Sequence, residues 1–517
     1  MLASGSALTR TRSNPLSLRD RQSAALRQML HFGEPINRKE TVFEPEWKVL
    51  IYDETGKNII SPLLSVKQLH EAGVTLYMSL HTERDEISDT PAIYLCEPTS
   101  VNITKISADL KANMYQEYYF NFTSPIARPE LEALANAAVS SGTTSNIKKI
   151  FDQHMNFISL EPDLFVLKHL KLPKNPQEMS RSDSQTPSSS GDRDSNSTSN
   201  NSSFYEFNTN KMQNPQPYIN AVSAGLYAIF ATLGAMPIIR ATKGHMADEI
   251  AKILDKKLRD SLRDNRATMF MDQGLNFQRP LLVMLDRNVD YSAPLMHSMA
   301  LQSICHDVLD LNLNYITVKQ EIDNPNANQA STGNAQKSYR TKVIDCSKDK
   351  TWQENKHRGF MEVANIIQTK TNEWSEDMKK LTQMKAEMGL DANNTAEGAI
   401  DVAESNKLLG NAVKNMPEKM QEKAELDDNM AIALEISKRY QEQDYDKYQE
   451  VESTLNTRNI TPSDMIAEHG QEEDKVRYLL YMLMRDVIKI GEIDKFKEEL
   501  SRQGKEKYAA WVGLNIF

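Results

Sequence analysis

The sequence predicts two α/β domains followed by a mainly helical third domain that carries a long helical hairpin. Short apolar, β-rich runs alternate with helical segments from about residue 43, which is typical of a doubly wound parallel sheet. Beyond residue 290 the pattern becomes helical, and apolar residues recur at every seventh position from Phe360 to Met388. The length of 517 residues also gives room for about three domains.

Residues 1–42 are predicted to form a basic arm that leads into a helix. Five arginines and one aspartate stand in the first 30 residues, without the apolar core of a signal peptide. This composition also resembles a mitochondrial transit peptide. We favour the exposed arm, because a family resemblance described below begins inside this segment.

Residues 43–150 are predicted to form the first α/β domain. Its predicted strands and intervening helices are 47–52, 66–72, 74–80, 92–96, 103–114 and 115–122. Two amphipathic helices are expected at its end, one around 131–135 and one at 146–151. From the residues alone, packing of both helices on the sheet is the favoured interpretation.

Residues 151–290 are predicted to form a second α/β domain, interrupted by a disordered insertion at 173–204. The insertion is rich in serine, and its stretch 180–203 has no Leu, Ile, Val or Phe with which to build a core. Residues 218–239 are long enough and apolar enough to be weighed as a membrane span. Gly225, Gly234 and Pro237 favour a buried helix followed by a strand instead.

Residues 280–285 are predicted to be a short buried strand that ends on a group of charged residues. This group and the proline that follows it consist of Asp286, Arg287, Asp290 and Pro294. An arginine among carboxylates favours a structural ion-pair cluster. The alternative is an α/β hydrolase or phosphotransferase that uses Asp286 and Asp290, since ligands of parallel sheets bind beyond the strand ends. No phosphate-binding or hydrolase motif accompanies them, so we expect no catalytic residue, metal or cofactor.

Residues 291–490 are predicted to form the helical third domain. The helix from Phe360 is expected to return through a second helix that contains Met416, Met420, Met430 and Leu434. An ordinary pair of core-facing helices would explain the apolar spacing. The number of methionines favours a surface that adapts to partner helices. The candidate groove residues are Trp374, Met378, Leu381, Met384, Met388 and Met420.

Charge and cysteine content narrow the class of protein further. A net charge of −10 and a pI near 5.6 argue against nucleic acid as the main partner. Cys96, Cys305 and Cys346 are far apart in the sequence, and apolar neighbours suggest that the first two are buried free thiols. This cysteine pattern is typical of a reducing compartment such as the cytoplasm.

Several segments resemble the SM (Sec-one/Munc-eighteen) family. The strand that ends Leu285-Asp286-Arg287, followed by Asp290 and by Pro294-Leu-Met-His297, is similar to the signature of these proteins. The resemblance also includes residues 93–98, 102–106, 226–240 and 476–483. Segments 21–30 and 151–157 are similar to the Sly-one branch, which serves ER–Golgi traffic.

The resemblance implies an arch-shaped, non-catalytic protein that promotes SNARE complex assembly in vesicle docking and fusion. It implies a hydrophobic pocket in the first domain for the N-terminal peptide of a syntaxin. The matching positions are Leu131, Leu134, Ala135, Ile147, Ile150 and Phe151. It also implies that the hairpin holds SNARE helices and that a lid lies within 389–415. The expected location is cytoplasmic, with peripheral association with ER and Golgi membranes through syntaxin-type and other SNARE partners.

The resemblance carries an expectation about the end of the chain as well. Family members normally continue well past the equivalent of Phe517, and that tail completes the sheet of the second domain. Residues 491–517 are therefore expected to be only a partial return segment. A sheet without its last strands would leave an apolar surface uncovered and lower the stability of the protein.

Overall fold

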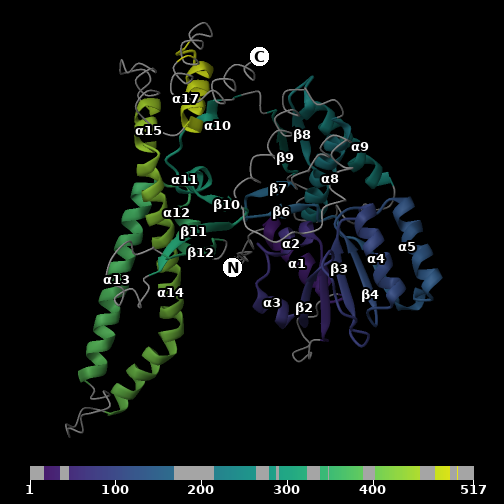
Figure 1. Ribbon diagram of the computed structural model, residues 1–517, viewed down its shortest axis with the longest axis horizontal. Coiled ribbons are helices and arrows are strands. Elements are labelled where there is room, and N and C mark those ends of the chain that lie inside the picture. The colour runs from purple at the N-terminus through teal and green to yellow at the C-terminus, as the bar shows by residue number, and fades with distance from the viewer. Residues whose placement is uncertain are drawn as a thin grey trace, which may run out of the picture. The chain divides into compact units, whose positions relative to one another are not determined.

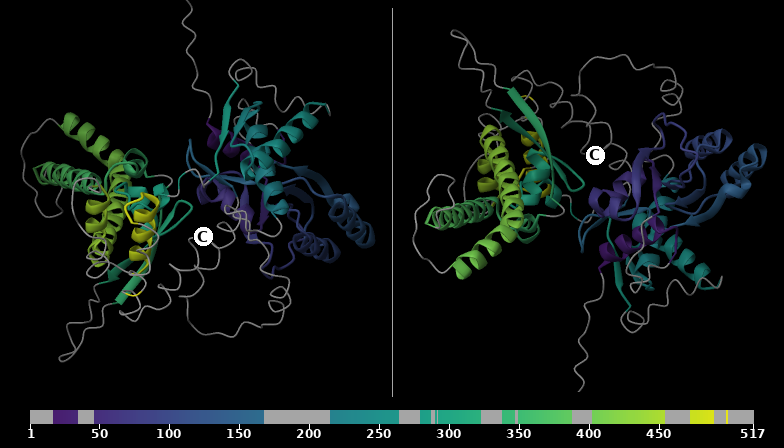
Figure 2. Two further views of the ribbon diagram at one scale, coloured as in Figure 1. Left: turned by 90° about the horizontal axis from the view of Figure 1, so that it is seen from above. Right: turned by 90° about the horizontal axis from the view of Figure 1, so that it is seen from below.

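The structure is a computed structural model, and its described part forms two compact units, Met1–Val289 and Asp290–Phe517. The residues that it describes are 17–34, 46–167, 215–263, 279–286, 290, 292–322, 338–346, 349–387, 402–453, 472–488 and 498. Figures 1 and 2 show the elements of each unit in chain order of colour. The finer division of the units into the predicted domains stays a prediction.

A five-stranded parallel sheet forms the centre of the first unit. Its order is β2-β1-β3-β4-β5, so β2 and β5 are the edge strands. Every residue of β3 is buried, as expected for a strand that is covered on both faces. The predicted doubly wound sheet is therefore confirmed. The strands are β1 (Lys48–Tyr52), β2 (Val74–Ser79), β3 (Ala92–Cys96), β4 (Tyr118–Phe122) and β5 (Ile147–Asp152).

Four helices connect these strands. They are α2 (Glu54–Ile60), α3 (Val66–Glu71), α4 (Ser100–Ala112) and α5 (Arg128–Ser141), and a 3-10 turn, η1 (Thr144–Asn146), leads into β5. Helices α4 and α5 pack side by side (Figure 1). Tyr94, Tyr118 and Phe120 of the sheet and Leu134 of α5 belong to one apolar core that lies under these two helices. Aromatic side chains fill this core with large apolar surfaces.

Asp53 joins the end of β1 to two neighbouring elements. One oxygen of its buried carboxylate accepts from the backbone N–H of Gly56 in α2 at 2.7 Å. The other accepts from the backbone of Glu97 and the side chain of Asn102, both at 2.9 Å. Helix α2 approaches β3 so closely that a Cβ on Gly56 would lie 2.3 Å from the carbonyl oxygen of Leu95. Only glycine fits at this contact.

The remainder of the first unit is built around an apolar helix. Its elements are α1 (Leu18–Leu30), β6 (Phe157–Ser159), β7 (Phe165–Leu167), α8 (Gln216–Leu233), β8 (Ile238–Ala241), α9 (Met246–Arg263) and β9 (Leu281–Met284). Strands β6 and β7 pair antiparallel, and β8 and β9 pair parallel. Buried Gln22 of α1 attaches that helix to β6, since its amide donates to Phe157 O at 2.9 Å and accepts from Ser159 N at 3.3 Å. The amide satisfies backbone groups at the edge of this short strand.

The second unit combines a helical hairpin with a small sheet that the sequence analysis missed. Strands β10 (Asp310–Asn312), β11 (Tyr315–Ile322) and β12 (Ser338–Asp345) are antiparallel in the order β10-β11-β12. Ile316 and Ile344 of this sheet pack in one core with Phe360 and Ile436 of the hairpin. The helices are α10 (Ser292–Leu295), α11 (Leu301–Val308), α12 (Lys350–Asn355), α13 (Phe360–Glu387), α14 (Val402–Glu442), α15 (Tyr445–Ser453) and α17 (Glu472–Met484).

The predicted long hairpin is confirmed as α13 and α14, which run beside each other (Figure 1). Val363 and Ile367 of the predicted heptad series are buried in the core at the base of the hairpin. Of the predicted lid, residues 402–415 belong to α14, whereas 389–401 lie outside the described residues. The predicted insertion at 173–204 and the return segment 491–517, apart from residue 498, also lie outside them.

Two further expectations meet the structure here. Within the described part of the chain, α8 and every other helix fall short of the length and apolar character that crossing a bilayer requires. Cys96, Cys305 and Cys346 are all buried free thiols, as predicted for the first two. Burial raises the pKa of each thiol, which keeps the sulfur protonated and unreactive.

Replacement of Gly56 by alanine tests the contact between α2 and β3. The added methyl group would clash with Leu95 O, so we expect Gly56→Ala to lower the free energy of unfolding by about 2 kcal/mol or more. The measurement is urea unfolding followed by circular dichroism. Gly359→Ala is the control, because open space surrounds that position and its stability should change little. Equal stability of the two variants would contradict the proposed contact.

Candidate functional site

Helix α5 supplies three of the six predicted peptide-pocket residues. The helix starts with Pro129 in its first turn and ends at Gly142, whose φ of 72° is left-handed. Leu131 is 40% exposed, and Ala135, one turn later, is exposed as well. Leu134, in contrast, is 1% exposed and belongs to the core of the sheet. The helix therefore presents Leu131 and Ala135 outward and uses Leu134 for its own packing.

The other three pocket residues lie on a strand, and the predicted helix at 146–151 is wrong. Residues Ile147–Asp152 form edge strand β5, in which half-buried and exposed positions alternate. The β-branched isoleucines pair in parallel with β4, a partner that local sequence does not reveal. Their helical spacing is accounted for by the register shift between Tyr118 and Tyr119. This irregularity allows Ile147 and Ile150 to share a face of the strand.

The register of β5 divides its residues between two faces. Ile147 is paired with Tyr118 and Ile150 with Phe120, so both lie on the face covered by α5. Phe151 is paired with Asn121 and lies on the opposite face. Its ring packs on Gly33, where a Cβ would come within 2.9 Å of it. Phe151 is therefore separated from the other five residues by the sheet.

The outward-facing residues define what we call the α5–β5 surface: Leu131, Ala135 and Ile150. Ile150 is 40% exposed, the same fraction as Leu131. Two ion pairs lie on the same elements, Arg128 with Glu132 at 2.8 Å and Lys148 with Glu117 at 3.3 Å. The arrangement offers two large apolar side chains and one small one within a charged surrounding. Such a surface suits a short apolar segment of another chain.

The structure separates the predicted groove residues of the hairpin into different environments. The indole N–H of Trp374 donates to the carbonyl of Lys419 at 3.1 Å, and Lys423 lies over its ring at 5.3 Å. Trp374 thus joins α13 to α14. Met420 is 69% exposed on α14, and Met378 is half-buried on α13. Leu381 and Met384 lie on α13, but their side chains, like the whole of Met388, fall outside the described residues.

The predicted buried strand before Asp286 is only half buried. Leu282 and Met284 of β9 pack against the core, whereas Leu281, Val283 and Leu285 are 60%, 55% and 68% exposed. The reason is that β8 and β9 form a two-stranded sheet, which among the described residues is covered by α8 and α9 on one face. A continuous apolar run therefore does not by itself show burial on both faces.

The signature carboxylates both cap helices. Asp286 Oδ1 accepts from the backbone N–H of Ala247 in the first turn of α9 at 3.1 Å. Asp290 Oδ1 accepts from the N–H and hydroxyl of Ser292 at 2.8 and 2.7 Å, at the start of α10. These bonds, chiefly those from Ser292, hold the pKa of Asp290 below its ordinary value. A carboxylate at a helix N-terminus is stabilised by the unpaired N–H groups there.

These positions do not support the enzyme alternative. Asp286 belongs to the first unit and Asp290 to the second, and each is bound to backbone N–H groups. Arg287 lies outside the described residues, and Pro294 is exposed within α10. Over the segments that the structure describes, His, Cys, Asp and Glu side chains form no group of three suited to a metal ion.

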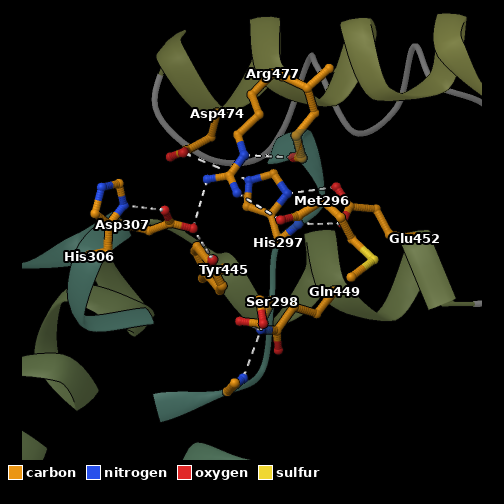
Figure 3. Close-up of polar contacts among 12 residues, drawn as sticks. Met296, His297, Ser298, His306, Asp307, Tyr445, Gln449, Glu452, Asp474 and Arg477 are labelled. Atoms are coloured by element: carbon orange, nitrogen blue, oxygen red, sulfur yellow. Dashed lines mark hydrogen bonds and ion pairs between the residues drawn. The ribbon is translucent and has the colours of Figure 1, made fainter. Parts of the chain in front are cut away.

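A buried ionic cluster in the second unit escaped the sequence analysis, although His297 stands in the signature itself. Its imidazole is fully buried, with Nδ1 2.6 Å from Glu452 Oε1 of α15 and Nε2 3.8 Å from Asp474 Oδ1 of α17 (Figure 3). The backbone N–H of His297 donates to the other oxygen of Glu452 at 2.7 Å. Tyr448 stacks on the ring at a centroid distance of 4.9 Å.

Arg477 extends this cluster to a neighbouring helix. Its guanidinium donates to the carbonyls of Leu295 and Met296 at 2.6 and 2.7 Å, and to Asp307 of α11 at 2.9 Å (Figure 3). Tyr445 also donates to Asp307, at 2.7 Å. We call the set His297, Asp307, Tyr445, Glu452, Asp474 and Arg477 the His297 network. It joins four segments of the second unit that are far apart in sequence.

The network shifts the pKa values of two of its members. Burial alone would lower the pKa of His297, but the carboxylates of Asp474 and Glu452 outweigh it and raise that pKa above its ordinary value. Burial would likewise raise the pKa of Asp307, yet contacts with His306, Arg477 and Tyr445 bring it to about 2. Both shifts favour the charged forms, so the network consists of ion pairs at neutral pH.

Comparison with known proteins follows from this geometry. The Sec1 family model matches residues 48–516 of the chain. The protein sly1 homolog of Drosophila melanogaster is 34% identical over 96% of this chain and 75% of its own length. Sec1 family domain-containing protein 1 of Homo sapiens is also 34% identical, over 94% of this chain and 73% of its own length.

A solved structure agrees with these relatives. The crystal structure of Sly1p in complex with an N-terminal peptide of Sed5p has a TM-score of 0.68 to this chain and 25% sequence identity. The similarity covers 97% of this chain and 75% of that one. The fold of this chain is therefore shared with a protein that was crystallised with a short peptide bound.

Variants at Asp286 distinguish a helix cap from a catalytic acid. Asp286→Leu removes the acceptor for Ala247 N, and we expect the free energy of unfolding to fall by about 1 kcal/mol. Asp286→Asn keeps an acceptor oxygen and should retain most of the stability. The measurement is guanidinium unfolding of both variants beside the wild type. Equal losses in the Leu and Asn variants would show that the charge, not the cap, is what the fold requires.

Proposed function

The chain belongs to the Sly1 branch of the Sec1 family, and from this premise we propose that it binds a syntaxin-type SNARE and promotes SNARE complex assembly in ER–Golgi vesicle docking and fusion. The observation that carries the proposal is its similarity to Sly1p, solved with an N-terminal peptide of Sed5p. The activity requires binding and alignment of helices, with no bond made or cut. Alignment lowers the entropy cost of bringing several chains together.

We propose that the α5–β5 surface receives the N-terminal peptide of the syntaxin. Leu131 and Ile150 provide exposed apolar area, and Ala135 lies one helical turn from Leu131 and leaves space for an apolar side chain of the peptide. Buried Leu134 and half-buried Ile147 belong to the core beneath this surface. Phe151 is left out of the proposed surface because it lies across the sheet. Edge strand β5 adds backbone groups that an extended peptide can pair with.

The hairpin is proposed to hold SNARE helices through the outer surface of α14. Met420 and Leu434 are 69% and 63% exposed, and both lie on this helix. Methionine adapts its shape to different apolar partners at little cost. The protein would reach ER and Golgi membranes from the cytoplasm through these SNARE partners. A lid within 389–415 that covers the groove is part of the same proposal.

Peptide binding tests the α5–β5 surface. We expect Leu131→Lys to weaken binding of an N-terminal syntaxin peptide about tenfold or more, since it removes apolar contact area equivalent to at least about 1.4 kcal/mol. The measurement is isothermal titration calorimetry. Val139→Lys is the matched control, because Val139 lies on the same helix, is 72% exposed and is outside the surface. If the two variants bound the peptide with equal affinity, this location would be wrong.

Assembly kinetics test the role of the hairpin. Met420→Glu places a charge on the outer surface of α14, and we expect it to slow SNARE complex formation severalfold without a change in melting temperature, because Met420 is 69% exposed. The measurement is fluorescence transfer between labelled SNAREs with the protein present. Gln421→Glu, which adds the same charge at the next position, should leave the rate near that of wild type. Equal rates for wild type and Met420→Glu would argue against this surface.

A further inference from the structure

The two ring nitrogens of His297 point to carboxylates from two different helices. Nδ1 is 2.6 Å from Glu452 of α15, and Nε2 is 3.8 Å from Asp474 of α17. The side chains of His297 and Glu452 are 0% and 2% exposed, and that of Asp474 is 16% exposed. Water therefore has little access to the three groups. Figure 3 shows the imidazole between the two helices.

Only the doubly protonated ring can serve both carboxylates. A neutral imidazole carries one N–H, and the short contact at Nδ1 would keep that proton for Glu452. Nε2 would then present a lone pair toward Asp474, so that two acceptors would face each other in a buried place. Nε2 has no other hydrogen-bond partner there. An unpaired buried acceptor is costly to the folded state.

We propose that His297 is a proton-dependent link between helices: its imidazolium holds α15 through Glu452 and α17 through Asp474, and loss of the proton releases the first turn of α17. The release is local. Arg477, one turn further along α17, keeps its bonds to Asp307 and to the carbonyls of Leu295 and Met296 without help from His297. The hairpin core does not include His297 and stays folded.

The other charged and titratable groups of the network do not change state in the same pH range. Arg477 stays protonated, and the pKa of Asp307 is about 2. Burial raises the pKa of the neighbouring tyrosines Tyr445, Tyr448 and Tyr478, so they stay neutral. His306 of α11 also titrates, and its pKa is raised chiefly by Asp307. It is 75% exposed and pairs with Asp307, not with α17, which makes it a useful control.

The sign of the pH dependence follows from the raised pKa of His297. Stabilisation by the imidazolium is fully present below the ordinary histidine pKa of about 6.5. It is lost as the pH rises through the higher pKa of the folded state. The first turn of α17 should therefore be protected in slightly acidic solution and opened in alkaline solution.

The test is hydrogen exchange of the full chain from pH 6 to pH 9, read by mass spectrometry and corrected for the intrinsic exchange rate. We expect protection at the start of α17 to fall about tenfold or more as the pH rises, the change that follows from loss of an interaction equivalent to one pKa unit. His297→Gln should show low protection at every pH. His306→Gln should keep the wild-type profile.

A second variant covers the case in which His297→Gln does not fold. Asp474→Asn can donate to the lone pair of a neutral imidazole, so its protection should no longer depend on pH in this range. Buried helix α4 of the first unit serves as the internal reference. A flat wild-type profile, or a wild-type pH dependence that persists in His297→Gln or Asp474→Asn, would overturn the proposal.

Discussion

Burial of the first sheet on both faces determines where this unit can meet another chain. Strands β1, β3 and β4 lie inside the sheet, and the helices on either side cover them. Close approach at Gly56 and the hydrogen bonds of Asp53 hold the helix and strand ends together at the centre. What remains accessible is the edge, where β5 and α5 present Leu131 and Ile150. The peptide surface proposed for this protein is thus a consequence of how the sheet is covered.

The second unit solves a different problem, because a long hairpin cannot be stabilised by its own two helices alone. The base of α13 and α14 is packed into a core with the β10–β12 sheet, which fixes Phe360, Ile367 and Ile436 in place. Further along, Trp374 joins the helices by a hydrogen bond to Lys419. With its base anchored in this way, α14 can leave Met420 and Leu434 exposed without losing its position.

Much of this architecture follows from the sequence, and the errors have physical reasons. Alternating apolar runs predicted the first sheet, and heptad spacing predicted the hairpin. Residues 147–151 were assigned to a helix because isoleucines three apart fit either a helix or a strand with a register shift, and only pairing with β4 decides between them. Leu134 was placed in the pocket because periodicity identifies an apolar helix face but not which residues reach the core. The His297 network escaped notice because Glu452 is 155 residues away from its partner.

The three buried thiols have a practical consequence for spectroscopy. Since Cys96, Cys305 and Cys346 are enclosed and remain protonated, maleimide dyes and spin labels have no accessible native attachment point among them. One cysteine introduced on an exposed position of α5 or α14 would then carry the only reporter, in an otherwise unmodified chain. Distances and motions of each unit become measurable without first replacing any native sulfur.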